Sequence, residues 1–348
     1  MKKVLRGTVA ALLAVAFVAF VAGCAKKGAG NPASAEKADT IAVFVPGVVS
    51  GSPVYEMLVA GTQKAVAEFP SAKVQVIEAG TNQAEWGDKL VSLVADGSYD
   101  LVITSNPAMP EIIAPVSERF PAVRFIAFDA WYQGNPRITT FRYNQREQAY
   151  VSGYMAALVA SGAMEHSLGT KKIGLIAGQE YPAMNGIILP GFLEGARAVN
   201  AGFEVDFRVV GNWYDATKGA ELAKSMHAAG ASVIMPIAGG ANQGVIAAAK
   251  DEPFYVAWFD DNGYAKAPGL VISSSVMAQE RLAYEKTKAW LDGSLEQGNP
   301  STVGIADGYV DFVANDPLWV EAVPEPLRVK MLDLLGRLKS GDLKLPVE

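Results

Sequence analysis

Short apolar segments alternate with longer amphipathic segments along most of the chain. Apolar runs of four to eight residues, bounded by polar residues or glycine, are typical of strands in a parallel sheet that helices cover on both faces. In the first half these runs lie at 40–46, 73–80, 99–106, 123–130 and 137–144, and the helical segments between and after them at 55–69, 84–97, 109–120 and 146–160. This alternation predicts repeated strand–helix–strand units.

The same alternation starts again at residue 172. The predicted strands of this second block lie at 172–178, 204–211, 231–237 and 254–260, and its helices at 186–200, at 216–230 and after a glycine-rich loop at 239–244. Two such blocks predict an α/β protein with two Rossmann-like lobes, each built on a parallel sheet and joined by a hinge.

The segment after the second block mixes strand and helix patterns, which is typical of a chain that crosses back between lobes. We therefore assign residues 40–143 and about 262–310 to an N-terminal lobe. Residues 144–261 and about 311–348 form the predicted C-terminal lobe.

The first 39 residues have a different character from the folded part. Met1-Lys2-Lys3 and Arg6 are followed by an uncharged stretch at 8–23 and then by Cys24, the only cysteine of the chain. A basic start before a short apolar stretch predicts a signal peptide at 1–23. Val21-Ala22-Gly23-Cys24 resembles the bacterial lipobox, so we expect a lipid on Cys24 and a flexible tether at 24–39. An ordinary signal peptide with an incidental cysteine is the alternative.

The segment at 1–39 predicts an exported protein that is anchored by lipid on the periplasmic side of a bacterial membrane. The net charge of −6 and the lack of a basic tract argue against a nucleic-acid partner. We find no motif of a metal-dependent, thiol, serine or nucleotide-dependent enzyme. We therefore expect a monomeric binding protein with no catalytic residue, no metal site and no cofactor.

Ligands of open parallel sheets bind beyond the carboxyl ends of the strands. Asn106, Asp129 and Asp260 lie at such ends. A carboxylate there can accept hydrogen bonds from a ring N–H group or from the hydroxyls of a sugar or sugar alcohol. Capping of the next helix is the alternative role for Asp260.

Aromatic side chains are common near the same strand ends. They include Tyr55, Trp131, Tyr143, Tyr181 and Trp213. Such rings can stack on a flat heterocycle. Trp131-Tyr132 and Trp213-Tyr214 follow strands of different lobes, so we expect them to form a clamp.

The loop Gly239-Gly240-Ala241-Asn242-Gln243-Gly244 stands between a strand and a helix. It lacks the spacing of a dinucleotide fingerprint and contains no lysine or arginine, which argues against a phosphate. Two interpretations remain open: a tight turn with close helix packing, or a loop whose backbone at Gly239 approaches an uncharged ligand.

Several stretches of the chain resemble the basic membrane protein family of substrate-binding lipoproteins, whose best-known members bind purine nucleosides for ABC transporters. The matching stretches, spread over residues 40–290, are DLVITSN, RFIAFDA, EQAYVSGYMAALVA, KIGLIAG, GFLEGARAVN, DATKGAELAKSM, VIMPIAGGANQGVIAAAK and WFDDN. The resemblance implies a type I periplasmic binding protein with a ligand in the cleft between its lobes. It also implies that Asp129 and Asp260 contact the ligand and that an ABC transporter permease is the partner.

The segment VPGVVSGSPVYEML departs from the nucleoside binders of the family. Those proteins have an aspartate-rich loop ending in Ser-Phe-Asn, where this chain has no aspartate and carries Tyr55-Glu56. The family's second stacking position, a phenylalanine, corresponds to Met235. The resemblance therefore implies a rebuilt ring pocket that keeps the polar contacts.

A flat ring with a hydroxylated chain would suit such a pocket, and riboflavin is our expected ligand. GSPVYEML also resembles the spirochaete riboflavin-binding members of the family. The alternatives are a purine nucleoside as the ligand, and a surface lipoprotein that senses a ligand instead of transporting it.

Overall fold

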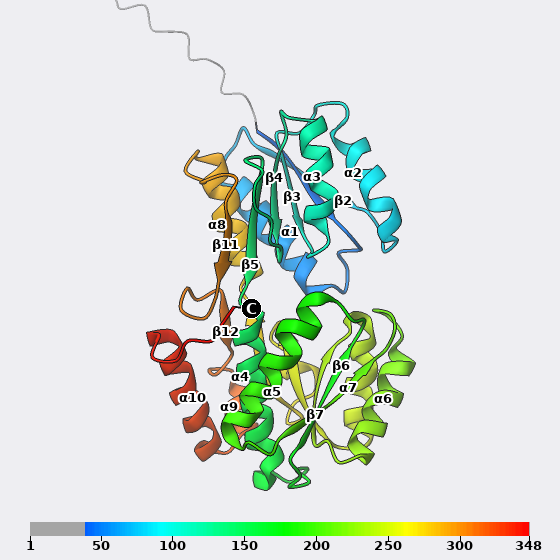
Figure 1. Ribbon diagram of the computed structural model, residues 1–348, viewed down its shortest axis with the longest axis vertical. Coiled ribbons are helices and arrows are strands. Elements are labelled where there is room, and N and C mark those ends of the chain that lie inside the picture. The colour runs from blue at the N-terminus through cyan, green and yellow to red at the C-terminus, as the bar shows by residue number, and fades with distance from the viewer. Residues whose placement is uncertain (1–38, 348) are drawn as a thin grey trace, which may run out of the picture. The chain divides into compact units, whose positions relative to one another are not determined.

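The computed structural model describes residues 39–347, which form one compact unit with two α/β lobes. The expected signal peptide, Cys24 and nearly all of the tether lie outside these residues. In Figure 1 the first lobe contains β1 to β5, and the second contains β6, β7 and helices α4 to α7. The expectation of two lobes with predominantly parallel sheets is therefore confirmed.

The first lobe is a six-stranded parallel sheet in the order β11-β5-β4-β3-β1-β2. Its strands are β1 (Thr40–Val45), β2 (Lys73–Glu78), β3 (Leu101–Ser105), β4 (Arg124–Phe128), β5 (Ile138–Tyr143) and β11 (Pro300–Val303). Its helices are α1 (Pro53–Val66), α2 (Trp86–Val94), α3 (Met109–Arg119) and α8 (Gln279–Leu291).

The second lobe repeats this plan in the order β12-β10-β9-β8-β6-β7, in which only β12 is antiparallel to its neighbour. Its strands are β6 (Lys172–Ala177), β7 (Glu204–Val209), β8 (Val233–Ile237), β9 (Tyr255–Asp260), β10 (Val271–Met277) and β12 (Val310–Phe312). Its helices are α4 (Gln145–Leu158), α5 (Leu189–Val199), α6 (Ala216–Ala228), α7 (Asn242–Asp251), α9 (Pro317–Ala322) and α10 (Glu325–Ser340).

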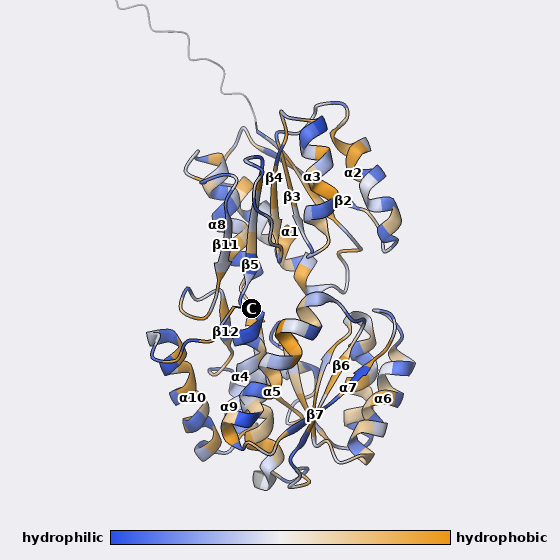
Figure 2. Cartoon of the chain, in the orientation of Figure 1, coloured by the Kyte–Doolittle hydropathy of each residue, from blue (hydrophilic) through white to orange (hydrophobic). Residues whose placement is uncertain are grey.

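The core of each lobe lies on both faces of its sheet, so the strands are mostly orange in Figure 2. In β1 the side chains alternate between two buried clusters, because successive residues of a strand point to opposite faces. Val43 belongs to the cluster that contains Leu58 of α1, and Phe44 to the cluster that contains Leu90 of α2. This two-sided burial explains why the strands are continuously apolar in sequence.

The chain passes between the lobes three times: between β5 and α4, between β10 and α8, and between β11 and β12. The backbone N–H of Asn144, at the first crossing, donates to the Val303 carbonyl at the third, over 2.8 Å. The hydroxyl of Tyr143 donates to Oε1 of Gln279, at the second crossing, over 3.0 Å. The three crossings therefore form one hydrogen-bonded hinge.

One part of the expected lobe division is wrong. Residues 262–277 were assigned to the first lobe, but β10 pairs with β9 and β12 in the second sheet. The chain returns to the first lobe only after Met277, where α8 begins. An apolar strand pattern cannot show which sheet the strand joins, because either sheet would bury it equally well.

Helices α4 and α5 pack at their backbones through glycines. A Cβ atom on Gly153 would lie 1.9 Å from the carbonyl oxygen of Phe192, and one on Gly195 would lie 2.0 Å from that of Tyr150. Real contacts of a Cβ atom are never that close, so these positions require the absence of a side chain.

We predict that Gly153→Ala destabilises the protein, because the added methyl group forces α4 and α5 apart. Overpacking of this kind lowers the free energy of unfolding by about 1–3 kcal/mol. Gly336→Ala is the matched control, since Gly336 lies in α10 with no heavy atom within 4 Å of the added Cβ. The control is expected to raise stability by about 1 kcal/mol through helix propensity. Urea unfolding of both variants measures the difference, and equal stabilities would contradict the packing argument.

Candidate functional site

Two aspartates stand out by their backbone conformation. Within residues 39–347, Asp129 (φ 50°) and Asp260 (φ 79°) are the non-glycine residues with positive φ. Asp129 directly follows β4 of the first sheet, and Asp260 ends β9 of the second. Left-handed backbone costs free energy for a residue with a side chain, and such strain is concentrated at functional sites.

The two carboxyl groups are close enough to influence each other. Burial raises the pKa of Asp129 to about 8, and the charge of Asp260 adds to this rise. Burial also raises the pKa of Asp260 to about 7, against a lowering hydrogen bond from Gln148. Both side chains still expose part of their surface. Because electrostatic repulsion is mutual, the pair carries fewer than two negative charges at neutral pH.

Three tyrosines surround the pair. The pKa of Tyr181 is raised by burial and then by the charges of Asp129 and Asp260, so this second-lobe ring lies close to both carboxyl groups. Burial raises the pKa of Tyr55 to about 12, with Asp129 as a further cause. Burial also raises the pKa of Tyr143, again with Asp129 as a secondary cause. The carboxyl ends of the two sheets therefore face each other.

Tyr55 and Asn106 form the first-lobe part of this site. Nδ2 of Asn106 donates to the Tyr55 hydroxyl over 3.4 Å, and that hydroxyl donates to the Pro46 carbonyl over 3.1 Å. Gly47 leaves room for the ring, since a Cβ there would lie 2.8 Å from Tyr55 Cε2. The segment that departs from the nucleoside binders is thus built around Tyr55.

Tyr181 and Trp213 form the second-lobe part. Their ring centroids are 6.0 Å apart with planes at 48°. The glycine-rich loop holds Trp213 in place: the N–H of Gly240 donates to the Trp213 carbonyl over 2.8 Å, and a Cβ on Gly239 would lie 2.8 Å from the same oxygen. The geometry of this loop agrees with a tight turn that packs closely against its neighbour.

Of three further expected site residues, two are buried and one is exposed. Met235 is fully buried within β8, so the structure does not place it as a ring-stacking residue. Tyr143 is only 1% exposed, and its hydroxyl is bound to the hinge residue Gln279. Trp131 is 43% exposed, and the Arg142 guanidinium lies 4.4 Å from its ring centroid.

Two residues at the site were missed by the sequence reasoning. Nε2 of Gln145 donates to Oδ1 of Asp129 over 3.3 Å, and Nε2 of Gln148 donates to Oδ1 of Asp260 over 3.2 Å. Both lie at the start of α4, directly after the strand that ends in Tyr143. Their spacing of three residues puts both side chains on one face of the first turn of a helix, directly after a strand end. This spacing could have identified them as site residues from the sequence.

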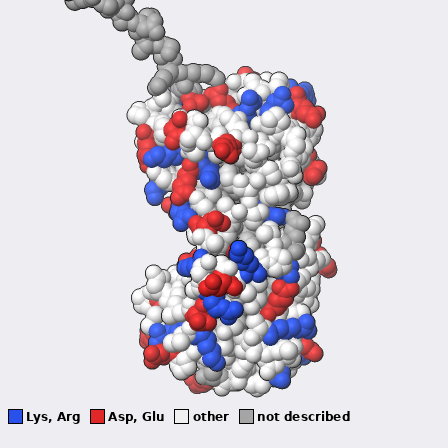
Figure 3. All heavy atoms as spheres, turned by 60° about the vertical axis from the view of Figure 1, so that its left-hand side comes forward, with Lys and Arg blue, Asp and Glu red and all other residues white. Residues whose placement is uncertain are grey.

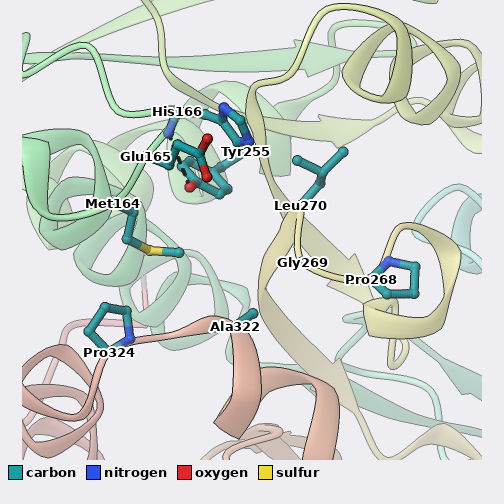
Figure 4. Close-up of a pocket in the computed structure, with 9 residues that line it drawn as sticks. All are labelled: Met164, Glu165, His166, Tyr255, Pro268, Gly269, Leu270, Ala322 and Pro324. Atoms are coloured by element: carbon teal, nitrogen blue, oxygen red, sulfur yellow. Dashed lines mark hydrogen bonds between the residues drawn. The ribbon is translucent and has the colours of Figure 1, made fainter.

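A surface hollow of about 540 Å³ lies elsewhere in the second lobe. Figure 4 shows His166 beside Tyr255, with Leu270 and Pro324 on other parts of the rim. Tyr255 begins β9 and Asp260 ends it, so the hollow and the carboxyl pair are separated by about 16 Å of strand. This hollow is therefore not part of the carboxyl site.

Between residues 39 and 347, no group of three His, Cys, Asp or Glu side chains is arranged to hold a metal ion. No helix in the same range is long and apolar enough to cross a membrane. Figure 3 shows acidic and basic side chains mixed over the face in view.

The two lobes, the three crossings and the facing strand ends define the type I fold of periplasmic binding proteins. A solved solute-binding protein of an ABC transporter system from Aeropyrum pernix has the same fold, with a TM-score of 0.75 at 19% identity, over 89% of this chain and 94% of that one. The chain belongs to the Bmp family, described as ABC transporter substrate-binding protein PnrA-like, which matches residues 38–344.

Two relatives illustrate the family. Basic membrane protein D from Borreliella burgdorferi is 24% identical over 94% of this chain and 93% of its own length. The ABC transporter nucleoside-binding protein BmpA from Lactococcus lactis is 23% identical over 62% of this chain and 63% of its own length. Membership of this family gives the chain a small-molecule ligand and an ABC permease as partners, and a place of action outside the cytoplasm.

We predict that the carboxyl pair makes the unliganded protein less stable as the pH rises. Because both folded pKa values lie above the ordinary 3.8, this contribution to stability is full below about pH 4 and is lost as the pH passes 7 and 8. Melting temperatures of the wild type and of the double variant Asp129→Asn/Asp260→Asn should therefore diverge between pH 5 and pH 9, with the wild type falling more steeply. Parallel curves would show that the pair is ionised without penalty.

Proposed function

We propose that this chain captures a neutral, flat heterocycle that carries a hydroxylated chain, and presents it to an ABC permease. The observation that carries this proposal is the pair Asp129 and Asp260, with strained backbones and raised pKa values, at the facing strand ends. Ligand hydroxyls donate to a carboxylate and accept from a carboxylic acid, so they satisfy the pair in either protonation state.

The aromatic rings around the pair support a flat ligand ring. Tyr181 and Trp213 from the second lobe and Tyr55 from the first offer apolar ring surface beside the two carboxyl groups. Contacts from both lobes would stabilise a closed state of the hinge, which is the state that the permease would recognise. Binding and release by hinge motion involve no covalent step, so we propose no enzymatic role.

Riboflavin is the first ligand that we propose. Its ring system is flat and largely apolar, and its ribityl chain carries the hydroxyls that the carboxyl pair would bind. The segment around Tyr55, which lacks the aspartates of the nucleoside binders, supports a ring pocket rebuilt for a ligand other than a nucleoside.

A purine nucleoside is the second candidate. Its support is the relative from Lactococcus lactis, which is named an ABC transporter nucleoside-binding protein. A ribose also offers two adjacent hydroxyls to the carboxyl pair.

We predict one-to-one binding of riboflavin by the purified protein, detected as quenching of riboflavin fluorescence and confirmed by calorimetry. Native mass spectrometry of the protein as purified should show a bound flavin. Tight binding of guanosine or inosine without riboflavin binding would replace the first candidate by the second. Failure of all these ligands to bind would overturn the proposed ligand class.

We further predict that Asp260→Asn weakens binding of the recognised ligand about 10-fold to 100-fold, because a neutral amide oxygen is a weaker acceptor than the ionised form of the carboxyl group. Asp261→Asn is the matched control. Oδ1 of Asp261 accepts from the Trp258 ring N–H and its Oδ2 lies 3.3 Å from Lys266 Nζ, so this neighbour is occupied elsewhere. Equal affinities of the two variants in calorimetry would remove Asp260 from the site.

We also propose that Cys24 carries the lipid that anchors the protein. Cys24→Ser in a bacterial host with lipoprotein processing should move the protein from the membrane fraction to the soluble fraction, as measured by immunoblot. Unchanged membrane association would contradict the anchor, and an unmodified mass of the mature wild type would identify an ordinary signal peptide.

A further inference from the structure

The first turn of α4 reaches both carboxyl groups of the site. Gln145 and Gln148 are three residues apart and therefore lie on the same face of the helix. Gln145 donates to Asp129 over 3.3 Å, and Gln148 donates to Asp260 over 3.2 Å. Each carboxyl group thus has its own amide donor, and the two donors share one helix.

The two hydrogen bonds differ in what they join. Asp260 and α4 both belong to the second lobe, so the Gln148 bond is internal to it. Asp129 belongs to the first lobe, so the Gln145 bond spans the two lobes at the first crossing. The start of α4 therefore fixes the position of one carboxyl group from each lobe relative to the other.

The helix start is itself held firmly. Oδ1 of Asn144 accepts from the N–H of Glu147 and caps α4, while the N–H of Asn144 donates to the third crossing. Gln148 is fully buried, and its Nε2 also lies 3.3 Å from the Ser275 carbonyl. These contacts leave Gln148 little rotamer freedom, as a positioning group requires.

Gln148 is also a donor that favours ionisation of Asp260. The charge of Asp260 raises the pKa of Asp129, and the charge of Asp261 raises the pKa of Asp260. Asp129 in turn raises the pKa values of Tyr55, Tyr143 and Tyr181. None of these groups is a cation. The hydrogen bond from Gln148 lowers the pKa of Asp260 against the effect of burial.

We propose that Gln145 and Gln148 are positioning residues, each of which orients one carboxyl group toward the ligand and keeps it available as an acceptor. Through α4 they set the spacing between the acceptor of the first lobe and the acceptor of the second. This role rests on the proposed function, since it selects ligands whose hydroxyl groups match that spacing.

A ligand-free measurement tests the positioning directly. Carboxyl ¹³C NMR of Asp-labelled protein, with Asp129→Asn and Asp260→Asn for assignment, gives the titration midpoint of each aspartate. Gln148→Met should raise the midpoint of Asp260, and Gln145→Met that of Asp129, each by about one pH unit, because a donor to the charged form is lost. Gln63→Met, at an exposed position of α1, is the control and should shift neither. Unchanged midpoints in both glutamine variants would overturn the proposal.

Ligand binding gives the second measurement. In calorimetry, each glutamine variant should bind the ligand that the wild type recognises about 10-fold more weakly. The rise of its affinity with pH should have its midpoint at a higher pH than in the wild type. In an Asp129→Asn background, Gln145→Met should weaken binding no further. A merely structural role would lower the melting temperature but leave the carboxyl midpoints and this coupling unchanged.

The two measurements separate the inference from the function on which it rests. If the wild type binds neither riboflavin nor a purine nucleoside, the proposed function fails, and the NMR titrations still decide whether the glutamines control the carboxyl groups. If the wild type binds its ligand and both glutamine variants bind it with the same affinity and pH dependence, the function stands and the positioning role is wrong.

Discussion

The burial of two carboxyl groups at facing strand ends is the constraint on which the rest of the site depends. Parallel strands end at the same edge of each sheet, and the three crossings bring the edges of the two lobes together. Asp129 and Asp260 therefore lie where burial opposes the ionisation of both, and the charge of Asp260 further opposes that of Asp129. The hinge positions the first turn of α4, and Gln145 and Gln148 in that turn hold this unfavourable pair in place by hydrogen bonds.

Much of the fold could be predicted from sequence, because strands buried on both faces have a continuous apolar pattern that separates clearly from amphipathic helices. Asp129 and Asp260 followed from the rule that ligands bind at the carboxyl ends of parallel strands. The segment at 262–277 shows the limit of this reasoning. It contains β10, which joins the second sheet and not the first, and a local apolar pattern does not show which sheet a strand joins.

Other features of the site depend on three-dimensional packing that no local pattern encodes. Met235 looked like a ring-facing position by resemblance but is fully buried in β8. Gln145 and Gln148 looked like ordinary polar residues of a helix, and their importance comes from the carboxyl groups that the crossings bring to them. The glycine-rich loop supports Trp213 through Gly239 and Gly240, which links its tight turn to the wall of the site.

A crystal structure of the protein with its recognised ligand would test the central claim most directly. The claim predicts hydroxyl groups of the ligand within hydrogen-bonding distance of both Asp129 and Asp260, and its ring beside Tyr181. A ligand bound away from the carboxyl pair, for example in the hollow beside His166 and Tyr255, would contradict it.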